Sequence, residues 1–472
     1  MIRATTGTWI NYATTLAFQV VFASRYGASP AAAGFVIAFG LAFAVTGVMV
    51  STVQSVAVPR LLAPQGGLAR GPVRFLAGLA LGATAFAVLL VFLAPSVAAL
   101  VAGRLGLDAQ LLRDLIVISA GVIAVQVVVG ELSSVAIVLG QRFVPAASAV
   151  LPSIAAMVGM LASPNVDVRT VYLLFLGGSL LQAALLGAIV VRPERLVAGN
   201  VPRMGAATLA MLGSYALLGF LTPAERVLAG FHSPADAAQY DYAIRSLRSV
   251  QQLILGGLVM ASLGDWSAMA TAGARQRLRQ SLFSGVLLAA VLLVAASSVA
   301  LVAAHPLVQW VFQRGNFTAH DSDVVVLALT VALPGFCAEG VTLVVGSALA
   351  GVRQNGTLAT IGVLNFIVRG ALLAIFAPRW GAVGAAAAYS VAASLFLVGF
   401  VLLAARQSLW PEEIWNSLRR VTAVGAGTIV ASALVLISRG VPASIGGALV
   451  AIVFLVLFVG LRPIPAFPSF SR

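Results

Sequence analysis

Six charged side chains lie inside long apolar stretches, and they are the residues whose types could do chemistry. They are Glu131, Asp241, Arg245, Arg248, Glu339 and Arg369. A guanidinium group binds phosphate or carboxylate oxygens through paired hydrogen bonds. A carboxylate in apolar surroundings can carry a proton or a cation. The sequence therefore offers candidates for anion binding and for ion coupling.

Arg245 and Arg248 are spaced by about one helical turn, and Asp241 precedes Arg245 by four residues. Two readings fit this spacing. In the first, Asp241 and Arg245 form an ion pair near a membrane surface, and Arg248 extends its charged end to that surface. In the second, the arginines form a cationic patch that holds a phosphate group, for which guanidinium groups are well suited.

Glu131 and Glu339 occupy similar places, 11 and 14 residues before Arg142 and Arg353 respectively. A difference of three residues keeps both acids on roughly one helical face. They are either proton or cation sites, or neutral acids hydrogen-bonded within a helix bundle. Arg369 lies at the centre of another apolar stretch, where it is a candidate for substrate binding or for pairing with one of these acids.

No metal or cofactor site is expected. The three histidines, His232, His305 and His320, are dispersed at the edges of apolar stretches, and the single cysteine, Cys337, lies inside one. A metal site needs several such ligands close together, and a disulfide needs a second cysteine.

The composition indicates a membrane protein. Of the 472 residues, 61% are hydrophobic and 9% are charged, and the mean hydropathy is +1.05; soluble domains carry about 25% charged residues. Several uncharged runs, such as those between Arg25 and Arg60 and between Arg379 and Arg406, are long enough for a helix to cross a membrane. The net charge of +14 comes from arginines placed singly at the ends of such runs, so no nucleic-acid partner is expected.

The fold class predicted is an all-α polytopic membrane protein with about 14 transmembrane helices. The predicted spans are 5–24, 31–58, 75–99, 114–139, 144–163, 170–191, 204–224, 236–264, 281–304, 321–350, 355–377, 380–405, 420–438 and 441–461. Pro152 and Pro334 are expected to kink the spans that contain them. Trp410, Ile414 and Leu418 share one face of a further helix, which favours an amphipathic segment anchored at the membrane surface over a docking site for a partner protein.

The distribution of arginine predicts the orientation. Of the 28 arginines, 17 lie on the side that holds the N-terminus, 8 lie on the opposite side, and 3 lie within spans. Because positive charge accumulates on the cytoplasmic side, both termini are predicted to be cytoplasmic.

Two segments are repeated at nearly the same offset. Residues 27–33 resemble residues 231–237, and residues 139–142 resemble residues 350–353. Six spans return the chain to its starting side, so the two units are predicted to be parallel repeats, with a substrate site between them and an alternating-access mechanism. The expected parts are an N-lobe with helices 1–6 (1–195), a C-lobe with helices 7–12 (196–406), an interfacial amphipathic helix (407–419), and helices 13 and 14 with a short tail (420–472).

A turn near the middle of the chain carries a family resemblance. Phe312 to Asp321 reads F-Q-R-G-N-F-T-A-H-D. A short amphipathic segment, a glycine suited to a positive φ angle and a threonine that can cap the next helix explain its composition. It resembles the F-x-R-G-x-F-T-x-x-D turn of the lipid II flippase family (MurJ/MviN), within the multidrug/oligosaccharidyl-lipid/polysaccharide (MOP) exporter superfamily.

The resemblance also covers other segments. Tyr240 to Arg245 is similar to the family's Y-A-D-R segment, which implies that Arg245 faces a cavity for a lipid diphosphate. Trp380 to Gly384 matches a late family pattern. The chain departs from the family in the first helix, where Trp9 to Gln19 contains no arginine, at Ala33, where the family has Asp, and at residues 40–44, which replace a basic tract.

The resemblance implies a flippase, not an enzyme, that moves a polyprenyl-diphosphate-linked cell-envelope glycan precursor similar to lipid II across the bacterial cytoplasmic membrane. Two alternatives in the same superfamily are an O-antigen or exopolysaccharide glycolipid flippase and a cation-coupled drug exporter. A third is a non-transporting scaffold for cell-wall enzymes. A glycosyltransferase is disfavoured because residues 25–29, the first loop on the far side, contain no carboxylate. The expected partners are the lipid-linked glycan, membrane lipids and, as candidates, cell-wall synthesis proteins, with the chain acting as a monomer.

Overall fold

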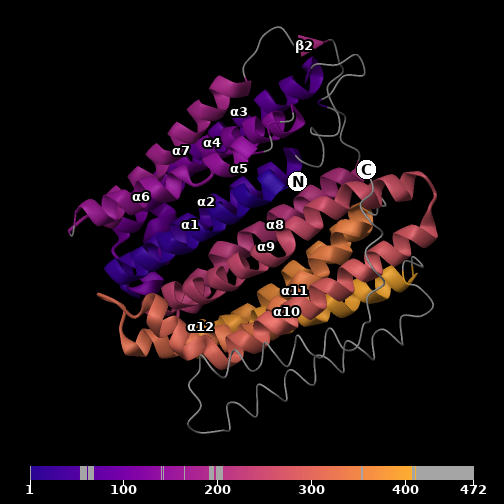
Figure 1. Cartoon of the computed structure of the whole chain (residues 1–472). Helices are drawn as coiled ribbons and strands as arrows, with labels where there is room; N and C mark the ends of the chain where they lie inside the picture. Colours follow the sequence, from indigo (N-terminus) through magenta and orange to yellow (C-terminus); the bar gives the residue numbers. More distant parts are fainter. Residues whose placement is uncertain are drawn as a thin grey trace. The chain divides into compact units, whose positions relative to one another are not determined.

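The computed structural model describes residues 2–53, 61, 68–139, 141, 143–163, 165–190, 196–197, 206–351, 355–406 and 410. Their helices are α1 (Ile2–Tyr26), α2 (Pro30–Thr52), α3 (Arg70–Leu105), α4 (Ala109–Val138), α5 (Phe143–Ser148), α6 (Leu151–Ala162), α7 (Val168–Val190), α8 (Ala206–Gly230), α9 (Pro234–Thr271), α10 (Arg275–Phe312), α11 (Ala319–Gly351) and α12 (Asn355–Arg406) (Figure 1). Two short strands, β1 (Leu68–Ala69) and β2 (Leu196–Val197), pair in parallel.

The predicted fold class is confirmed, since long helices dominate the described residues and eight helical segments, one of them formed by α5 and α6 together, are apolar and long enough to cross a membrane. The number 14 stays a prediction. The expected interfacial helix (407–419) and helices 13 and 14 (420–472) lie outside the described residues, apart from Trp410.

Several predicted boundaries differ from the structure, which has α10, for example, at Arg275–Phe312 where the sequence predicts 281–304; three differences change how the chain is divided into helices. The expected span 144–163 matches an apolar span over Phe143–Ala162, but this span is divided into α5 and α6, and Pro152 lies at the start of α6, where a missing N–H is tolerated. The helix expected to end at residue 224 continues to Gly230 as α8, so Glu225 and Arg226 are helical. The expected spans 355–377 and 380–405 form α12, which is interrupted at Gly381.

The interruption of α12 has a specific partner. Gly381 has φ 55° and ψ −131°, a combination that favours glycine. The Ala382 N–H that follows it donates a hydrogen bond to Asp236 Oδ1 at 2.8 Å, and His232 Nδ1 lies 2.8 Å from Asp236 Oδ2. Asp236 therefore caps the second part of α12 from the start of α9, which accounts for a glycine in the Trp380–Gly384 pattern.

The contacts divide the chain into two compact units. Unit 1 contains residues 1–242, 314–318 and 362–385, and unit 2 contains residues 243–313, 319–361 and 386–472. The boundary between them falls inside α9 and α12 and on both sides of the turn after α10. The division into an N-lobe and a C-lobe of six helices each stays a prediction.

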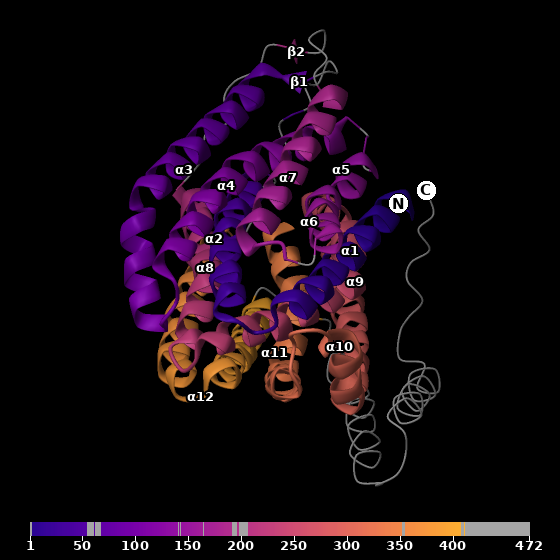
Figure 2. The same cartoon turned by 90° about the vertical axis from the view of Figure 1, so that its left-hand side faces the viewer.

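In unit 1, α4 packs against α2, α3 and α7, and α2 also packs against α8 (Figure 2). Aromatic side chains from α1, α2 and α7 form a buried cluster in this unit. Phe18 and Phe22 of α1 lie against Phe35 of α2, with ring centroids 6.3 Å and 4.5 Å from it. Tyr172 of α7 lies 5.1 Å from Phe35, edge to face, and its hydroxyl bonds Ser119 of α4 at 3.0 Å.

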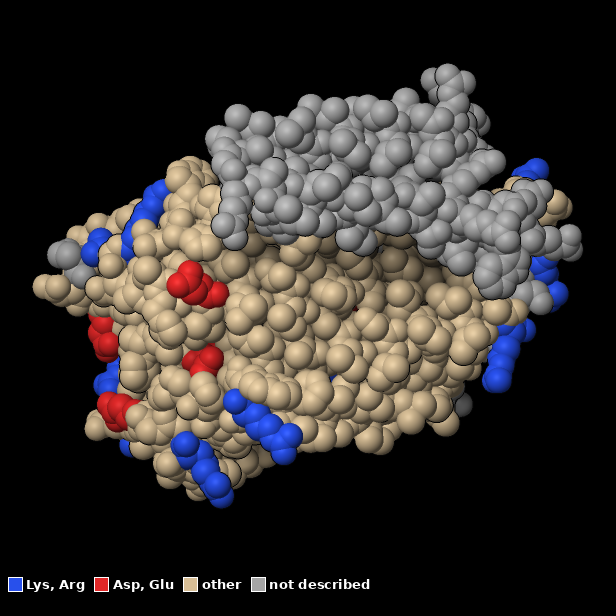
Figure 3. All heavy atoms as spheres, turned by 90° about the horizontal axis from the view of Figure 1, so that it is seen from below, with Lys and Arg blue, Asp and Glu red and all other residues tan. Residues whose placement is uncertain are grey.

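The outward surface carries large apolar side chains. Phe92 of α3 is 77% exposed, and Leu81 and Leu100 of the same helix are also exposed. On the face shown in Figure 3, most of the described surface is uncharged. Exposed apolar side chains of this kind suit contact with lipid tails.

The turn that carries the family resemblance is fastened to the end of α1 within unit 1. The Asn316 N–H donates to the Ser24 carbonyl oxygen at 2.9 Å, and the Asn316 side-chain amide donates to the Arg25 carbonyl oxygen. Gly315 has φ +59°, as the sequence predicts, and a Cβ there would collide with the Ser24 carbonyl oxygen. The short amphipathic segment expected before the turn is the last part of α10, and α11 begins at Ala319, directly after Thr318.

Gly315→Ala is expected to destabilise the protein by about 2–4 kcal/mol, because the positive φ alone costs about 1–3 kcal/mol and the collision with Ser24 adds to it. Gly106→Ala is the matched control, since Gly106 has φ +64° and nothing lies within 4 Å of a Cβ there. The measurement is thermal unfolding of the purified proteins in detergent. Equal losses in the two variants would contradict the close contact with Ser24.

Candidate functional site

A cluster of buried charges lies in unit 1 around the end of α8. We call it the α8 charge cluster; it consists of Glu225, Arg226, Tyr240, Asp241 and Arg369. All five side chains are buried. They come from α8, the start of α9 and the first part of α12, so residues far apart in the sequence meet here.

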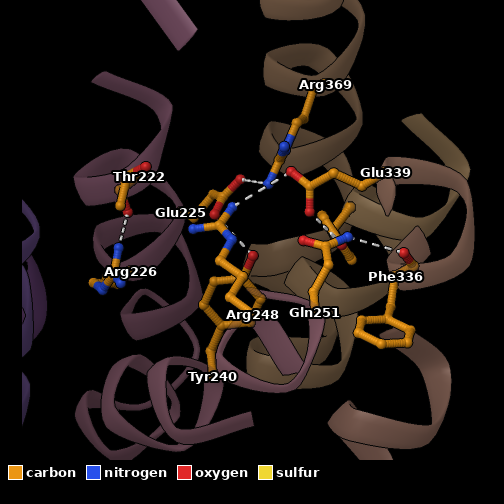
Figure 4. Close-up of polar contacts among 10 residues, drawn as sticks. Thr222, Glu225, Arg226, Tyr240, Arg248, Gln251, Phe336, Glu339 and Arg369 are labelled. Atoms are coloured by element: carbon orange, nitrogen blue, oxygen red, sulfur yellow. Dashed lines mark hydrogen bonds and ion pairs between the residues drawn. The ribbon is translucent and has the colours of Figure 1, made fainter. Parts of the chain in front are cut away.

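Each acid in this cluster has an arginine partner. Arg226 Nε donates to Asp241 Oδ1 at 2.7 Å, and the Arg226 Nη2 group pairs with the same oxygen. Arg369 pairs with Glu225, whose other oxygen accepts a hydrogen bond from the Tyr240 hydroxyl at 2.8 Å (Figure 4). The two acids and two arginines cancel in charge, which offsets the large cost of removing each ion from water.

Arg226 also lies against α2. Its Nη1 group donates to the Thr222 carbonyl oxygen, and a Cβ at Gly40 would be only 3.1 Å from that nitrogen. Glycine at position 40 therefore lets the guanidinium group approach the α2 backbone closely. In the family resemblance, residues 40–44 replace a basic tract, and here α8 brings a cation to the same part of α2.

A second polar cluster lies in unit 2, where α9, α11 and the second part of α12 meet. We call it the α11 polar cluster; it consists of Arg248, Gln251, Glu339 and Tyr389. The Tyr389 hydroxyl donates to Glu339 Oε2 at 2.6 Å, and Arg248 Nη2 lies 4.0 Å from Glu339 Oε1. Gln251 donates to the Phe336 carbonyl oxygen at 3.2 Å (Figure 4). The side chains of Arg248 and Glu339 are about one third exposed (34% and 33%), so this ion pair is only partly buried.

The six predicted site residues therefore separate into different surroundings. Asp241 and Arg369 belong to the α8 charge cluster, and Arg248 and Glu339 belong to the α11 polar cluster. Arg245 is half-buried in α9, one turn before Arg248 and on the same side of that helix. Glu131 is buried in α4 and is a member of neither cluster. Their roles stay predictions.

Glu225 and Arg226 are the residues that the sequence reasoning missed. The predicted span ends at residue 224, so both residues fall outside it. One signal was present, because the apolar residues Val227 to Gly230 continue the helix after them. Among the described residues, no group of three or more His, Cys, Asp or Glu side chains could hold a metal ion.

Comparison with known proteins agrees with this fold. A family model described as lipid II flippase MurJ matches residues 22–455, whereas a search of curated proteins returns no match. A solved structure of lipid II flippase MurJ in an inward closed conformation is 16% identical, covers 98% of this chain and 100% of its own, and has a TM-score of 0.77.

Two further solved structures share the fold. A MOP superfamily transporter from Pyrococcus furiosus is 11% identical, with 88% of this chain and 95% of that chain covered and a TM-score of 0.60. An inward-facing multidrug resistance transporter of the MATE family is 12% identical, with 84% and 94% covered and a TM-score of 0.63. The family resemblance carried by the Phe312–Asp321 turn is thereby confirmed, and the chain belongs to the lipid II flippase MurJ family of multi-pass membrane transporters, which are not enzymes.

Proposed function

We propose that this chain moves a polyprenyl-diphosphate-linked glycan precursor of the cell envelope, similar to lipid II, from the inner to the outer leaflet of the bacterial cytoplasmic membrane. The observation that carries the proposal is the family match over residues 22–455. We place both termini in the cytoplasm, because the side that holds the N-terminus carries 17 of the 28 arginines.

In this proposal the diphosphate binds to Arg245 and Arg248 of α9. Both side chains are half-buried in a helix of which they are the only arginines, and they lie on the same side of it. A guanidinium group forms strong, paired hydrogen bonds with phosphate oxygens. The Glu339 carboxylate, 4.0 Å from Arg248, holds that side chain in place without fully neutralising it. Arg369 is less suited to bind the substrate than Arg245 and Arg248, because it is paired with Glu225 in the buried α8 charge cluster.

The mechanism proposed is alternating access, with the glycan headgroup passing through the protein while the lipid tail stays in the bilayer. Solved relatives with this fold support it, because they include MATE family transporters in inward-facing and in outward-facing conformations. Headgroup binding would shift the equilibrium between the inward-facing and outward-facing states. The shift in free energy equals the difference between its binding free energies to the two states.

Depletion of the protein in its own bacterium tests the cargo. Lipid-linked precursors are extracted and identified by mass spectrometry, with re-expression of the wild-type chain as the control. We expect lipid II, or a related polyprenyl-diphosphate glycan, to accumulate several-fold. Accumulation of an O-antigen or exopolysaccharide precursor would reassign the cargo. No change in any lipid-linked precursor would overturn the flippase proposal and favour a scaffold or a drug exporter.

A further inference from the structure

Glu131 of α4 is a buried acid without a counter-charge. Its side chain is 7% exposed, and no donor among the described residues reaches its buried Oε1 atom. Within the same described part of the chain, no ion pair involves it. It differs in this from Glu339, its predicted counterpart, which Tyr389 and Arg248 both contact.

The helices packed against α4 bring no cation to the level of Glu131. On α7, the only charged residue is Arg169, which pairs with Asp114 at 3.0 Å near the start of α4. The bonds from Ser119 to Tyr172 and from Gln126 to Ser179 keep α4 and α7 parallel in one register. This register places Glu131 toward the far end of α7, several turns beyond Arg169.

Within their described residues, α2 and α3 also present no charge that faces Glu131. Between Pro30 and Thr52, α2 has no charged residue, and α5 has none either. The apolar Val50 side chain of α2 packs beside Glu131, since a Cβ at Gly130 would lie 2.5 Å from Val50 Cγ2. The charged residues of α3 are Arg70, Arg74 and Arg104, and all three side chains are exposed.

A carboxylate in such surroundings is costly as an ion. Removing an isolated negative charge from water without a partner costs many kcal/mol, and the group avoids this cost by binding a proton. A neutral carboxyl group suits apolar neighbours far better. Release of the proton then requires a conformation in which water or a cation reaches this part of α4.

We propose that Glu131 is a proton-binding site of the transport cycle, carrying a proton on its carboxyl group in the present conformation and releasing it to water in another. The step forms and breaks one O–H bond and requires no other reactant. The second half of the proposal rests on the proposed function, because it needs a second transport conformation. The first half, proton binding at neutral pH, stands independently of it.

Infrared spectroscopy of the purified protein tests proton binding without any transport assay. A protonated carboxyl group has a C=O stretching band that is distinct from the bands of a carboxylate. We expect Glu131→Gln to lose one such band at pH 7, and Glu339→Gln, the matched control, to keep it. A spectrum unchanged by Glu131→Gln would overturn the proposal. Glutamine has nearly the shape of a protonated glutamate, so the thermal midpoint of Glu131→Gln should stay within a few degrees of the wild type. If Glu131→Gln is unstable, Glu131→Asp replaces it in the test, and this variant should keep the band at a shifted frequency.

The link to transport is tested in liposomes of bacterial phospholipids, with lipid II as the probe. We expect an imposed proton gradient to change the flipping rate of the wild-type protein several-fold and to leave that of Glu131→Gln unchanged. An equal response of both proteins would overturn the transport half of the proposal. Absence of flipping by the wild type at any pH would count against the proposed cargo instead, and the infrared result would still decide whether Glu131 holds a proton.

Discussion

Arg369→Ala is expected to destabilise the protein by about 3–5 kcal/mol, because it leaves the Glu225 carboxylate buried without its cation. Glu225 is 1% exposed, so water cannot replace the lost partner. The Tyr240 hydroxyl would remain as its hydrogen-bond donor, which reduces the loss without removing it. The measurement is thermal unfolding in detergent, together with the amount of protein recovered from membranes.

Two controls make this test specific. Arg379→Ala removes an exposed arginine from the same helix and should leave stability within about 0.5 kcal/mol of the wild type. The double variant Glu225→Gln with Arg369→Met removes both charges and should regain most of the stability, because the desolvation cost of both ions disappears with the pair. A stable Arg369→Ala variant that fails to transport would contradict the structural role and support the substrate role predicted from the sequence.

Arg245→Ala is expected to abolish flipping while leaving expression and membrane insertion intact. Loss of a desolvated, charge-assisted contact with a diphosphate costs on the order of 2–5 kcal/mol, which is roughly thirty-fold or more in affinity. No arginine inside α1 or α2 could compensate, since Arg3 and Arg25 lie at the two ends of α1 and α2 contains no arginine. Arg245→Lys should restore flipping only in part, because a point charge replaces a two-pronged donor.

Complementation of a depleted strain measures this effect, with the lipid-linked precursor that accumulates as the second readout. Arg277→Ala is the control, because Arg277 is exposed at the start of α10 and has no role in the proposed site. Normal growth with Arg245→Ala would reject the diphosphate site on α9. Loss of growth with both variants would point to a general effect on folding or insertion.

The sequence predicts the membrane helices well, because the free-energy cost of placing a charged residue in lipid depends on that residue and not on distant parts of the fold. An uncharged run of sufficient length is helical wherever it lies, and the runs of α2, α3, α4 and α7 are confirmed as helices. The turn at Gly315 is also predicted correctly, because a positive φ angle depends on the residue itself.

The same reasoning fails where charges are neutralised at long range. Glu225 and Arg226 look like the end of a span, but Arg369 and Asp241 compensate them, and neither partner can be recognised from the sequence around α8. The sequence predicts a break between residues 377 and 380, around Pro378, whereas the structure has it at Gly381. The reason is similar, since the side chain that caps the helix after the break is Asp236 of α9. Contacts of this kind depend on the packed fold, so sequence patterns alone cannot assign them.

The composition of unit 1 also has a consequence for biogenesis. Glu225 leaves the ribosome in α8, and α9, α10 and α11 must all be synthesised before Arg369 follows in α12. Until Arg369 is made, the Glu225 side chain has no cation to pair with. It must then lie at the membrane surface or in the translocation channel, or else carry a proton. Unit 1 is therefore completed late in translation, and a chain truncated before α12 should be a substrate for membrane proteases although most of its helices have already been made.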